Sequence, residues 1–211
     1  MKTVRTVCNS YLVNSYIVIA EDNTSVLIDP ACSSKEEFNR FLKIADDYKL
    51  NVVASIITHP HADHVMGVKF MTDAFPQAEL LMHQEGLPLY RAMNDYSLIM
   101  GFQKKEIPNP TRFVCDNELL KFSDIELKVL YTPGHSPGSI CLYAQSNNMV
   151  FSGDVLFQNS IGRTDLPGGS FELLKKSIYE KLFTLPDDTI VLPGHGDQTN
   201  IEYEKKHNPF L

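Results

Sequence analysis

The residues best suited to chemistry lie in one short stretch, in which three histidines and one aspartate fall within six positions. The stretch reads Thr58-His59-Pro60-His61-Ala62-Asp63-His64. Residues 52–57, directly before it, form a continuous apolar run with β-branched members, which predicts a buried strand. Because Pro60 disfavours a helix, His59 and His61 should leave an extended chain on the same face.

This pattern fits a metal site. Imidazole and carboxylate groups together are the ligands of zinc, iron and manganese in proteins. His59 and His61 can share one ion, while Asp63 and His64, beyond the turn, can serve a second ion close by. The alternative is a polar surface loop with scattered histidines. Because three of the 7 histidines occupy this one stretch after an apolar strand, the metal site is the better explanation.

Three later segments also place a histidine or an aspartate beside a glycine at the end of a strand-like run. They are Thr132-Pro133-Gly134-His135-Ser136-Pro137-Gly138, Phe151-Ser152-Gly153-Asp154 and Leu192-Pro193-Gly194-His195-Gly196. The glycine before each candidate ligand predicts a tight turn that directs the side chain. Together with the histidine stretch, these segments supply seven potential metal ligands.

The rest of the chain predicts strands and helices that would position these ligands. Strands are expected within residues 1–29 and at residues 52–57, 78–82, 118–122, 125–131, 139–143, 149–151 and 189–192. Helices are expected from Ser33 or Ser34 to about Tyr48, from Val65 to about Asp73, from Ser170 to Leu182, and over residues 201–206. Residues 84–111 are apolar without a single period. They form either a helical insertion that covers the site and contacts substrate or, as preferred here, ordinary core packing.

In this order, and over essentially the whole chain, the histidine stretch and the three later segments resemble the metallo-β-lactamase superfamily. The resemblance implies an α/β fold of four layers, an αββα sandwich with two mixed sheets face to face and helices outside. The length of 211 residues fits one domain covering residues 1–211. In this family an aspartate at the position of Asp29 supports the metal loop from behind, whereas spacing alone fits a turn aspartate before proline equally well.

The resemblance also implies a two-metal site. His59, His61 and His135 would hold one ion, Asp63, His64 and His195 would hold the other, and Asp154 would bridge them. Two divalent ions are therefore expected, with zinc as the first choice and iron or manganese as alternatives. A metal-bound hydroxide would be the nucleophile, because a cation lowers the pKa of bound water to about 7. Asp63 and Asp154 are then the candidate catalytic side chains.

Three features resemble the short bacterial members of the glyoxalase II branch, which is the hydroxyacylglutathione hydrolase group. They are Gly153-Asp154-Val155-Leu156-Phe157, the tract 160–169 and the terminal residues 208–211. The resemblance implies cleavage of a small acyl thioester such as a hydroxyacyl-glutathione. Arg163 is the candidate for holding a substrate carboxylate or carbonyl, and the alternative is a loop arginine paired with Asp165. Since the chain ends soon after His195, weak glutathione affinity is expected and another thiol carrier remains open.

Other functions of the same ligands stay open. A persulfide dioxygenase would use His59, His135 and Asp154 around a single iron. A lactonase-type or β-lactamase hydrolase is a further alternative, and a metal-binding module without turnover is the least favoured.

The charge and the hydropathy of the chain limit the classes of partner that it is expected to bind. The formal net charge of −7 argues against a nucleic-acid partner, and no apolar run is long enough to cross a membrane. Without a convincing signal peptide, a cytoplasmic location is expected. The sequence does not predict the oligomeric state.

Overall fold

Two six-stranded mixed sheets form the centre of the computed structural model, which describes all 211 residues. The first sheet has the strand order β1 (Lys2–Cys8), β2 (Val13–Ile19), β3 (Thr24–Ile28), β4 (Asn51–Ile56), β5 (Glu79–His83) and β6 (Arg112–Val114). The second has the order β14 (Thr199–Asn200), β13 (Ile190–Pro193), β10 (Met149–Gly153), β9 (Ile140–Ala144), β8 (Ile125–Tyr131) and β7 (Leu119–Phe122). Both combine parallel and antiparallel pairs. A small hairpin, β11 (Leu156–Phe157) and β12 (Ser160–Ile161), follows β10.

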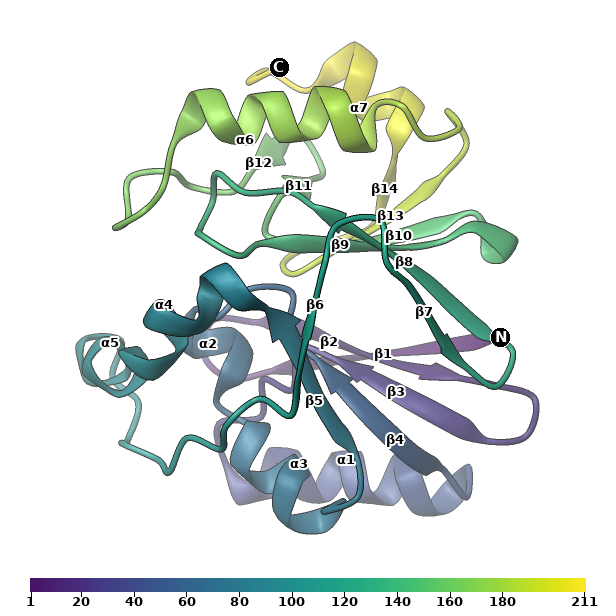
Figure 1. Ribbon diagram of the computed structural model, residues 1–211, viewed down its shortest axis with the longest axis vertical. Coiled ribbons are helices and arrows are strands. Elements are labelled where there is room, and N and C mark those ends of the chain that lie inside the picture. Colours follow the sequence, from purple (N-terminus) through teal and green to yellow (C-terminus); the bar gives the residue numbers. More distant parts are fainter.

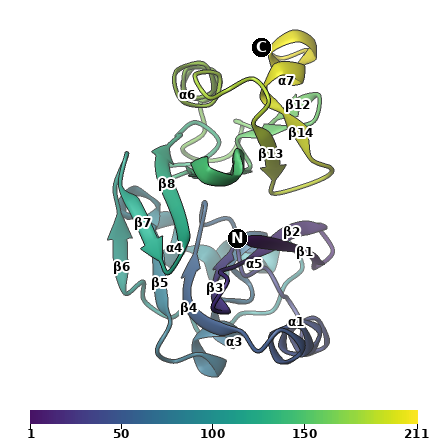
Figure 2. The same cartoon turned by 90° about the vertical axis from the view of Figure 1, so that its right-hand side faces the viewer.

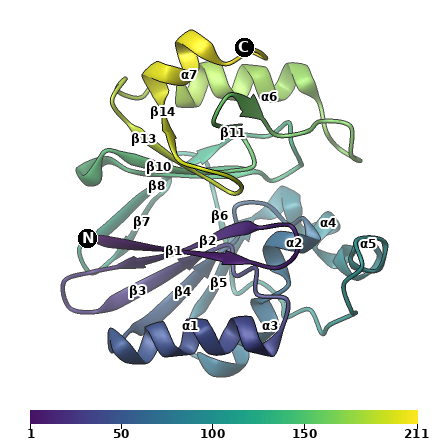
Figure 3. The same cartoon turned by 180° about the vertical axis from the view of Figure 1, so that it is seen from behind.

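Helices cover the outer faces of both sheets (Figures 1, 2 and 3). Helices α1 (Lys35–Asp47) and α3 (Val68–Ala74) lie outside the first sheet. Helices α6 (Phe171–Ser177) and α7 (Ile201–His207) lie outside the second. The short helices α2 (Ala62–Val65), α4 (Leu87–Arg91) and α5 (Met93–Ile99) gather at one end of the sandwich. This arrangement confirms the predicted αββα sandwich.

The core follows from the two-residue period of the strands. In β2, Tyr16 and Val18 pack between the two sheets, whereas Ile17 and Ile19 pack on the other face, in the cluster that includes Phe38 of α1. Every residue of β2 is buried, as expected for a strand covered on both faces. Side chains from both sheets fill the central layer, and burying each large one contributes about 1.5–3 kcal/mol.

Most predicted elements are present, but one predicted helix is divided into two. Ser34 and Ser170 cap α1 and α6 as expected, each accepting a backbone N–H three residues later. The helix predicted from Val65 to Asp73 is instead two helices, α2 and α3, separated at Gly67. A side chain at Gly67 would meet the Pro30 carbonyl oxygen at 2.5 Å, and the Gly67 N–H donates to that same oxygen. A distant loop therefore fixes the break.

Residues 84–111 combine the two alternatives weighed for them. Tyr90 and Met93 are buried in a cluster with α2, which is ordinary core packing. Leu89 and Tyr96 instead line a cavity at the end of the sandwich. Core packing, which was preferred, is thus present, and some residues of the segment also line the cavity. None of the helices combines the length and apolarity needed to cross a membrane.

Candidate metal centre

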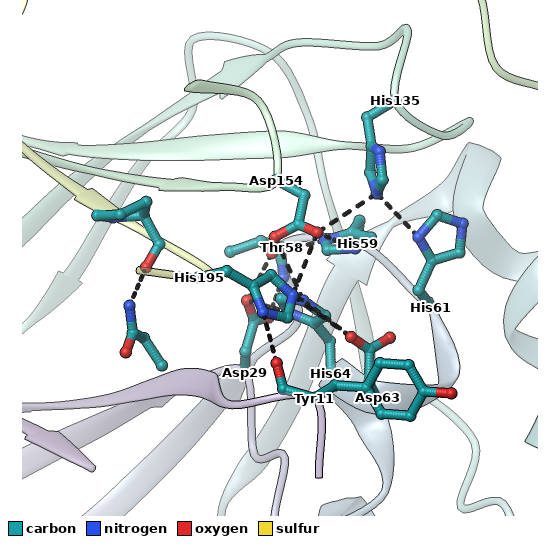
Figure 4. A network of polar contacts seen from close by, with 12 residues as sticks. Tyr11, Asp29, Thr58, His59, His61, Asp63, His64, His135, Asp154 and His195 are labelled. Carbon is teal, nitrogen blue, oxygen red and sulfur yellow. Dashed lines mark hydrogen bonds and ion pairs between the residues drawn. The ribbon is translucent and has the colours of Figure 1, made fainter. Parts of the chain in front are cut away.

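The seven predicted ligands converge at one end of the sandwich, where strands of both sheets terminate (Figure 4). His59 follows β4, and His61 is the residue before α2, which carries Asp63 and His64. From the second sheet, His135 lies in the loop between β8 and β9, while Asp154 and His195 follow β10 and β13. The structure therefore brings together residues as far apart in the chain as His59 and His195, which are separated by 136 positions.

Six of these residues form two groups whose ligand atoms lie within 4.8 Å of one another: His59, His61 and His135, and Asp63, His64 and His195. In the first group, His135 Nε2 lies 2.8 Å from His61 Nδ1. In the second, His195 Nε2 lies 3.2 Å from His64 Nε2 and 3.4 Å from Asp63 Oδ2. These are the two groups expected from the sequence.

Asp154 lies between the two groups. Its Oδ2 is 3.7 Å from His135 Nε2 and 3.4 Å from His195 Nε2. Its Oδ1 is 3.3 Å from His64 Nε2. One carboxylate thus faces a histidine of each group, which is the position a bridging ligand needs.

Hydrogen bonds to the outer ring nitrogens orient four of the histidines. His135 Nδ1 donates to the Arg163 carbonyl oxygen at 2.8 Å, and His195 Nδ1 donates to the Tyr11 carbonyl oxygen at 2.9 Å. His64 Nδ1 donates to Asp29, and His59 Nδ1 lies 3.1 Å from Thr58 Oγ1. With each Nδ1 occupied in this way, each Nε2 points into the site as a donor to metal.

Asp29 supports both groups from behind. Its carboxylate accepts hydrogen bonds from Thr58 N at 2.7 Å, Thr58 Oγ1 at 2.6 Å and His64 Nδ1 at 3.0 Å. Because the Thr58 hydroxyl proton goes to Asp29, the Thr58 oxygen accepts from His59. Asp29 therefore orients one histidine of each group, and this supports its predicted role over that of a turn aspartate. Its φ of 51° is an uncommon conformation that the surrounding bonds hold. These bonds use its carboxylate, so Asp29 is a support for the ligands, although it also lies near His59 and His64.

The donor atoms fit a bound metal. His59 Nε2 and Asp154 Oδ1 are buried without a hydrogen-bond partner, which is costly unless a cation satisfies them. A side chain at Gly194 would meet Asp154 Oδ1 at 2.2 Å and His64 Cε1 at 2.8 Å. Gly194 is thus required by close approach, whereas Gly134 and Gly153 have the positive φ of tight turns, 131° and 48°. The tight-turn explanation therefore holds for two of the three glycines.

Without bound metal, the histidines of the two groups differ in charge. Burial lowers the pKa of His61 to about 4 and lowers those of His59 and His135 as well, so the first group is neutral and ready to bind. Burial opposes a charge on His195, but Asp154 and Asp63 outweigh it and raise its pKa to about 9. The same two carboxylates, together with Asp29, outweigh burial and raise the pKa of His64. Metal binding to the second group must therefore release protons.

A cavity of about 590 Å³ opens on the centre. His61, Asp63, His135, Asp154 and His195 form its floor. Arg163 also lines it, but its guanidinium makes two hydrogen bonds of 2.7 Å to Asp165 and is exposed. The pairing with Asp165 that was the alternative for Arg163 is thus present, and its role toward substrate stays a prediction.

Two residues of the site were not found from the sequence. The Tyr11 carbonyl orients His195, and its hydroxyl donates to the Met100 carbonyl at 3.1 Å. Buried Asn14 donates through Nδ2 to the Pro193 and Gly196 carbonyls at 2.9 Å, and through its backbone to the Gly194 carbonyl at 2.7 Å. Both residues form hydrogen bonds with residues 193–196, which lie more than 170 positions later in the chain, so no local pattern marks them. The one signal is a polar pair, Asn14 and Ser15, inside an apolar strand.

Replacement of Asn14 by leucine, which is similar in volume, should misplace the loop of His195. It removes one donor from each of two carbonyl groups, which keep the Tyr16 hydroxyl and Arg5 as donors. The loss of two hydrogen bonds should lower the free energy of unfolding by about 1–3 kcal/mol. Urea unfolding measures this loss, and metal content should fall with it. Asn51→Ala, at an exposed position of β4, is the matched control and should change neither. Unchanged stability in Asn14→Leu would contradict this role.

Comparison with known proteins agrees with this geometry. The family model described as the metallo-beta-lactamase superfamily matches residues 6–195. The probable metallo-hydrolase YqgX of Bacillus subtilis (strain 168) is 37% identical over 199 residues, which cover 94% of this chain and 92% of that protein. The hydroxyacylglutathione hydrolase GloC of Haemophilus influenzae is 33% identical over 199 residues, with coverage of 94% and 92%.

Solved structures share the fold over its full extent. The B3 metallo-beta-lactamase BLEG-1 has a TM-score of 0.91 at 33% identity, covering 100% of this chain and 99% of that one. TTHA1623 in a di-iron-bound form has a TM-score of 0.87 at 33% identity, with coverage of 99% and 100%. ETHE1 from Myxococcus xanthus has a TM-score of 0.82 at 28% identity, with coverage of 99% and 84%. The sequence match and the shared αββα architecture together establish that this chain belongs to the metallo-beta-lactamase superfamily.

Proposed function

We propose that this protein is a metal-dependent hydrolase that cleaves a small acyl thioester at a two-metal site. The observation that carries the proposal is the Asp154 carboxylate, which lies between the two groups of ligands and has a buried, unpartnered oxygen. His59, His61 and His135 would hold one ion, Asp63, His64 and His195 the other, and Asp154 would bridge them. Bound divalent ions would supply Lewis-acid activation of water and of the thioester carbonyl.

The protein's own groups would orient the reactants. Asp29, Thr58 and the carbonyls of Tyr11 and Arg163 fix the ring tautomers of the histidines, so the ligands need no rearrangement on binding. The guanidinium of Arg163, at the rim of the cavity, would exchange its pairing with Asp165 for a carboxylate or carbonyl of the substrate.

The relatives support hydrolysis of a thioester. GloC is named a hydroxyacylglutathione hydrolase and YqgX a probable metallo-hydrolase, and both align with nearly the whole chain. The similarity to TTHA1623 supports two ions and makes iron, beside zinc and manganese, a candidate for this site.

A persulfide dioxygenase is the second candidate, since the fold also resembles ETHE1 at 28% identity. This reaction would use His59, His135 and Asp154 around one iron. The second group, Asp63, His64 and His195, is fully assembled and oriented, and this favours the two-metal hydrolase.

Elemental analysis of the purified protein, combined with two assays, tests the proposal. We expect close to two divalent ions per chain, release of thiol from acyl thioesters, and loss of that release after chelation. Oxygen uptake with a thiol persulfide should be absent. One iron per chain with oxygen uptake and no thiol release would contradict the hydrolase and establish the dioxygenase.

A further inference from the structure

One wall of the cavity is apolar and is not used by any metal ligand. It consists of Leu89 of α4, Tyr96 and Ile99 of α5, and Met100, and these four residues are called the apolar wall below. Four residues from the second half of the chain, Phe157, Ile161, Leu166 and Pro167, also line the cavity. Apolar residues from both halves of the chain therefore line the space above the metal centre.

One residue of the apolar wall, Ile99, is exposed where ordinary packing would not leave it so, whereas Leu89, Tyr96 and Met100 are half-buried. Ile99 is 84% exposed although it lies beside Leu89, Tyr96 and Met100. Single exposed apolar residues are common and need no explanation. An exposed isoleucine that continues a half-buried apolar group beside a cavity, however, is typical of a surface that a ligand covers.

The apolar wall is held in place before any ligand binds. Tyr11 donates through its hydroxyl to the Met100 carbonyl, and its ring lies 5.5 Å from that of Phe102. On the inner face of α5, Met93 is buried, and the buried Ser97 hydroxyl donates to the Met93 carbonyl. A rigid apolar surface binds an apolar group without an ordering cost.

The cavity lining offers little positive charge to a strongly anionic carrier. Arg163 is the only lysine or arginine in the cavity lining, and its guanidinium makes two hydrogen bonds to Asp165. The other charged lining groups, apart from the histidines, are the candidate ligands Asp63 and Asp154. Glutathione carries two carboxylates and an ammonium group, and the apolar wall offers no partner for them.

We propose that the substrate of this enzyme carries an aliphatic or aromatic group directly beside the thioester, and that this group lies on the apolar wall. This inference rests on the proposed thioesterase function and adds the chemical class of the substrate. The apolar group could belong to the acyl half or to the thiol half, and two series of substrates distinguish these sources.

The first series joins acyl groups from acetyl to octanoyl to one small thiol, N-acetylcysteamine. The second joins an acetyl group to unbranched thiols from ethanethiol to octanethiol. For the metal-loaded enzyme we expect kcat/KM to rise by about fourfold per added methylene in the series whose chain contacts the apolar wall. A flat dependence in both series, with S-lactoylglutathione hydrolysed best, would overturn the proposal while leaving the thioesterase function intact.

Neighbouring residues of α5 provide a matched pair of variants. Ile99 lines the cavity, whereas Leu98 is also exposed, at 54%, but does not line it. Ile99→Ser should lower the ratio of kcat/KM for the longest and shortest substrates at least threefold, and Leu98→Ser should keep the wild-type ratio. Equal ratios in both variants would contradict the assignment of the wall.

A binding measurement separates this inference from the chemistry. A thioether analogue, in which a methylene replaces the thioester carbonyl, is not hydrolysed. It should bind the metal-loaded protein more tightly as its chain lengthens, as measured by calorimetry. Ile99→Ser should weaken that trend. A trend that is absent from the wild-type protein would overturn the inference, whatever the result for catalysis.

Discussion

Replacement of Asp154 by asparagine should reduce thioester hydrolysis by on the order of 10³-fold while leaving the fold intact. Asparagine preserves the shape of the side chain but removes the charge that faces both groups of histidines at 3.4 and 3.7 Å. An amide presents only one oxygen, so it cannot bridge two ions as a carboxylate does. We therefore also expect metal content to fall from two ions toward one per chain.

The measurements are steady-state kinetics and elemental analysis, with circular dichroism to establish that the variant is folded. Asp188→Asn removes a carboxylate from an exposed position far from the cavity lining and should change none of these quantities. If Asp154→Asn hydrolysed thioesters at the wild-type rate, the two-metal centre could not be the site of the reaction.

Asp29→Asn should have the next largest effect, although Asp29 does not line the cavity. Three donors face its carboxylate, and an amide would set its own N–H₂ group against at least one of them. Loss of such a supporting group typically lowers metal affinity or activity by about 10–100-fold. Asparagine tolerates the positive φ of this position, so the effect reports on hydrogen bonding and not on backbone strain.

Thr58→Val provides the comparison for Asp29, because it removes the hydroxyl that contacts His59 but keeps the hydrogen bond that His64 donates to Asp29. Metal titration should therefore show one weakened ion in Thr58→Val and two in Asp29→Asn. Asp46→Asn, on the exposed side of α1, serves as the control for charge. Equal titrations for wild type and Asp29→Asn would rule out the proposed support.

The ligands themselves could be predicted because each has a local pattern. A buried strand, a glycine and then a histidine or aspartate occur at His135, Asp154 and His195, whereas His59 follows a buried strand and precedes Pro60. The residues that hold these ligands in place could not be predicted, because their partners are remote in sequence. Asn14 holds the His195 loop, and Gly67 divides a predicted helix because of the Pro30 carbonyl. Asp29 was suggested by the family resemblance, and its hydrogen bonds are visible only in the structure.

Residues 84–111 were hard to predict for a different reason. Their apolar residues serve two surfaces, since Tyr90 and Met93 face the core while Leu89 and Ile99 face the cavity. Both surfaces are apolar, so composition and period do not separate them. Distinguishing them requires knowledge of which side chains remain exposed after folding.

The attachment of His195 to Tyr11 and Asn14 has a consequence for the protein's synthesis. The candidate ligands up to His64 leave the ribosome long before His195, and at ordinary elongation rates the interval is roughly 7–26 s. During this interval the second group of ligands is incomplete, and the pairing of β2 with the end of β13 cannot form. Under the proposed two-metal arrangement, binding of the second ion would therefore be a late event, which follows docking of the two halves of the chain.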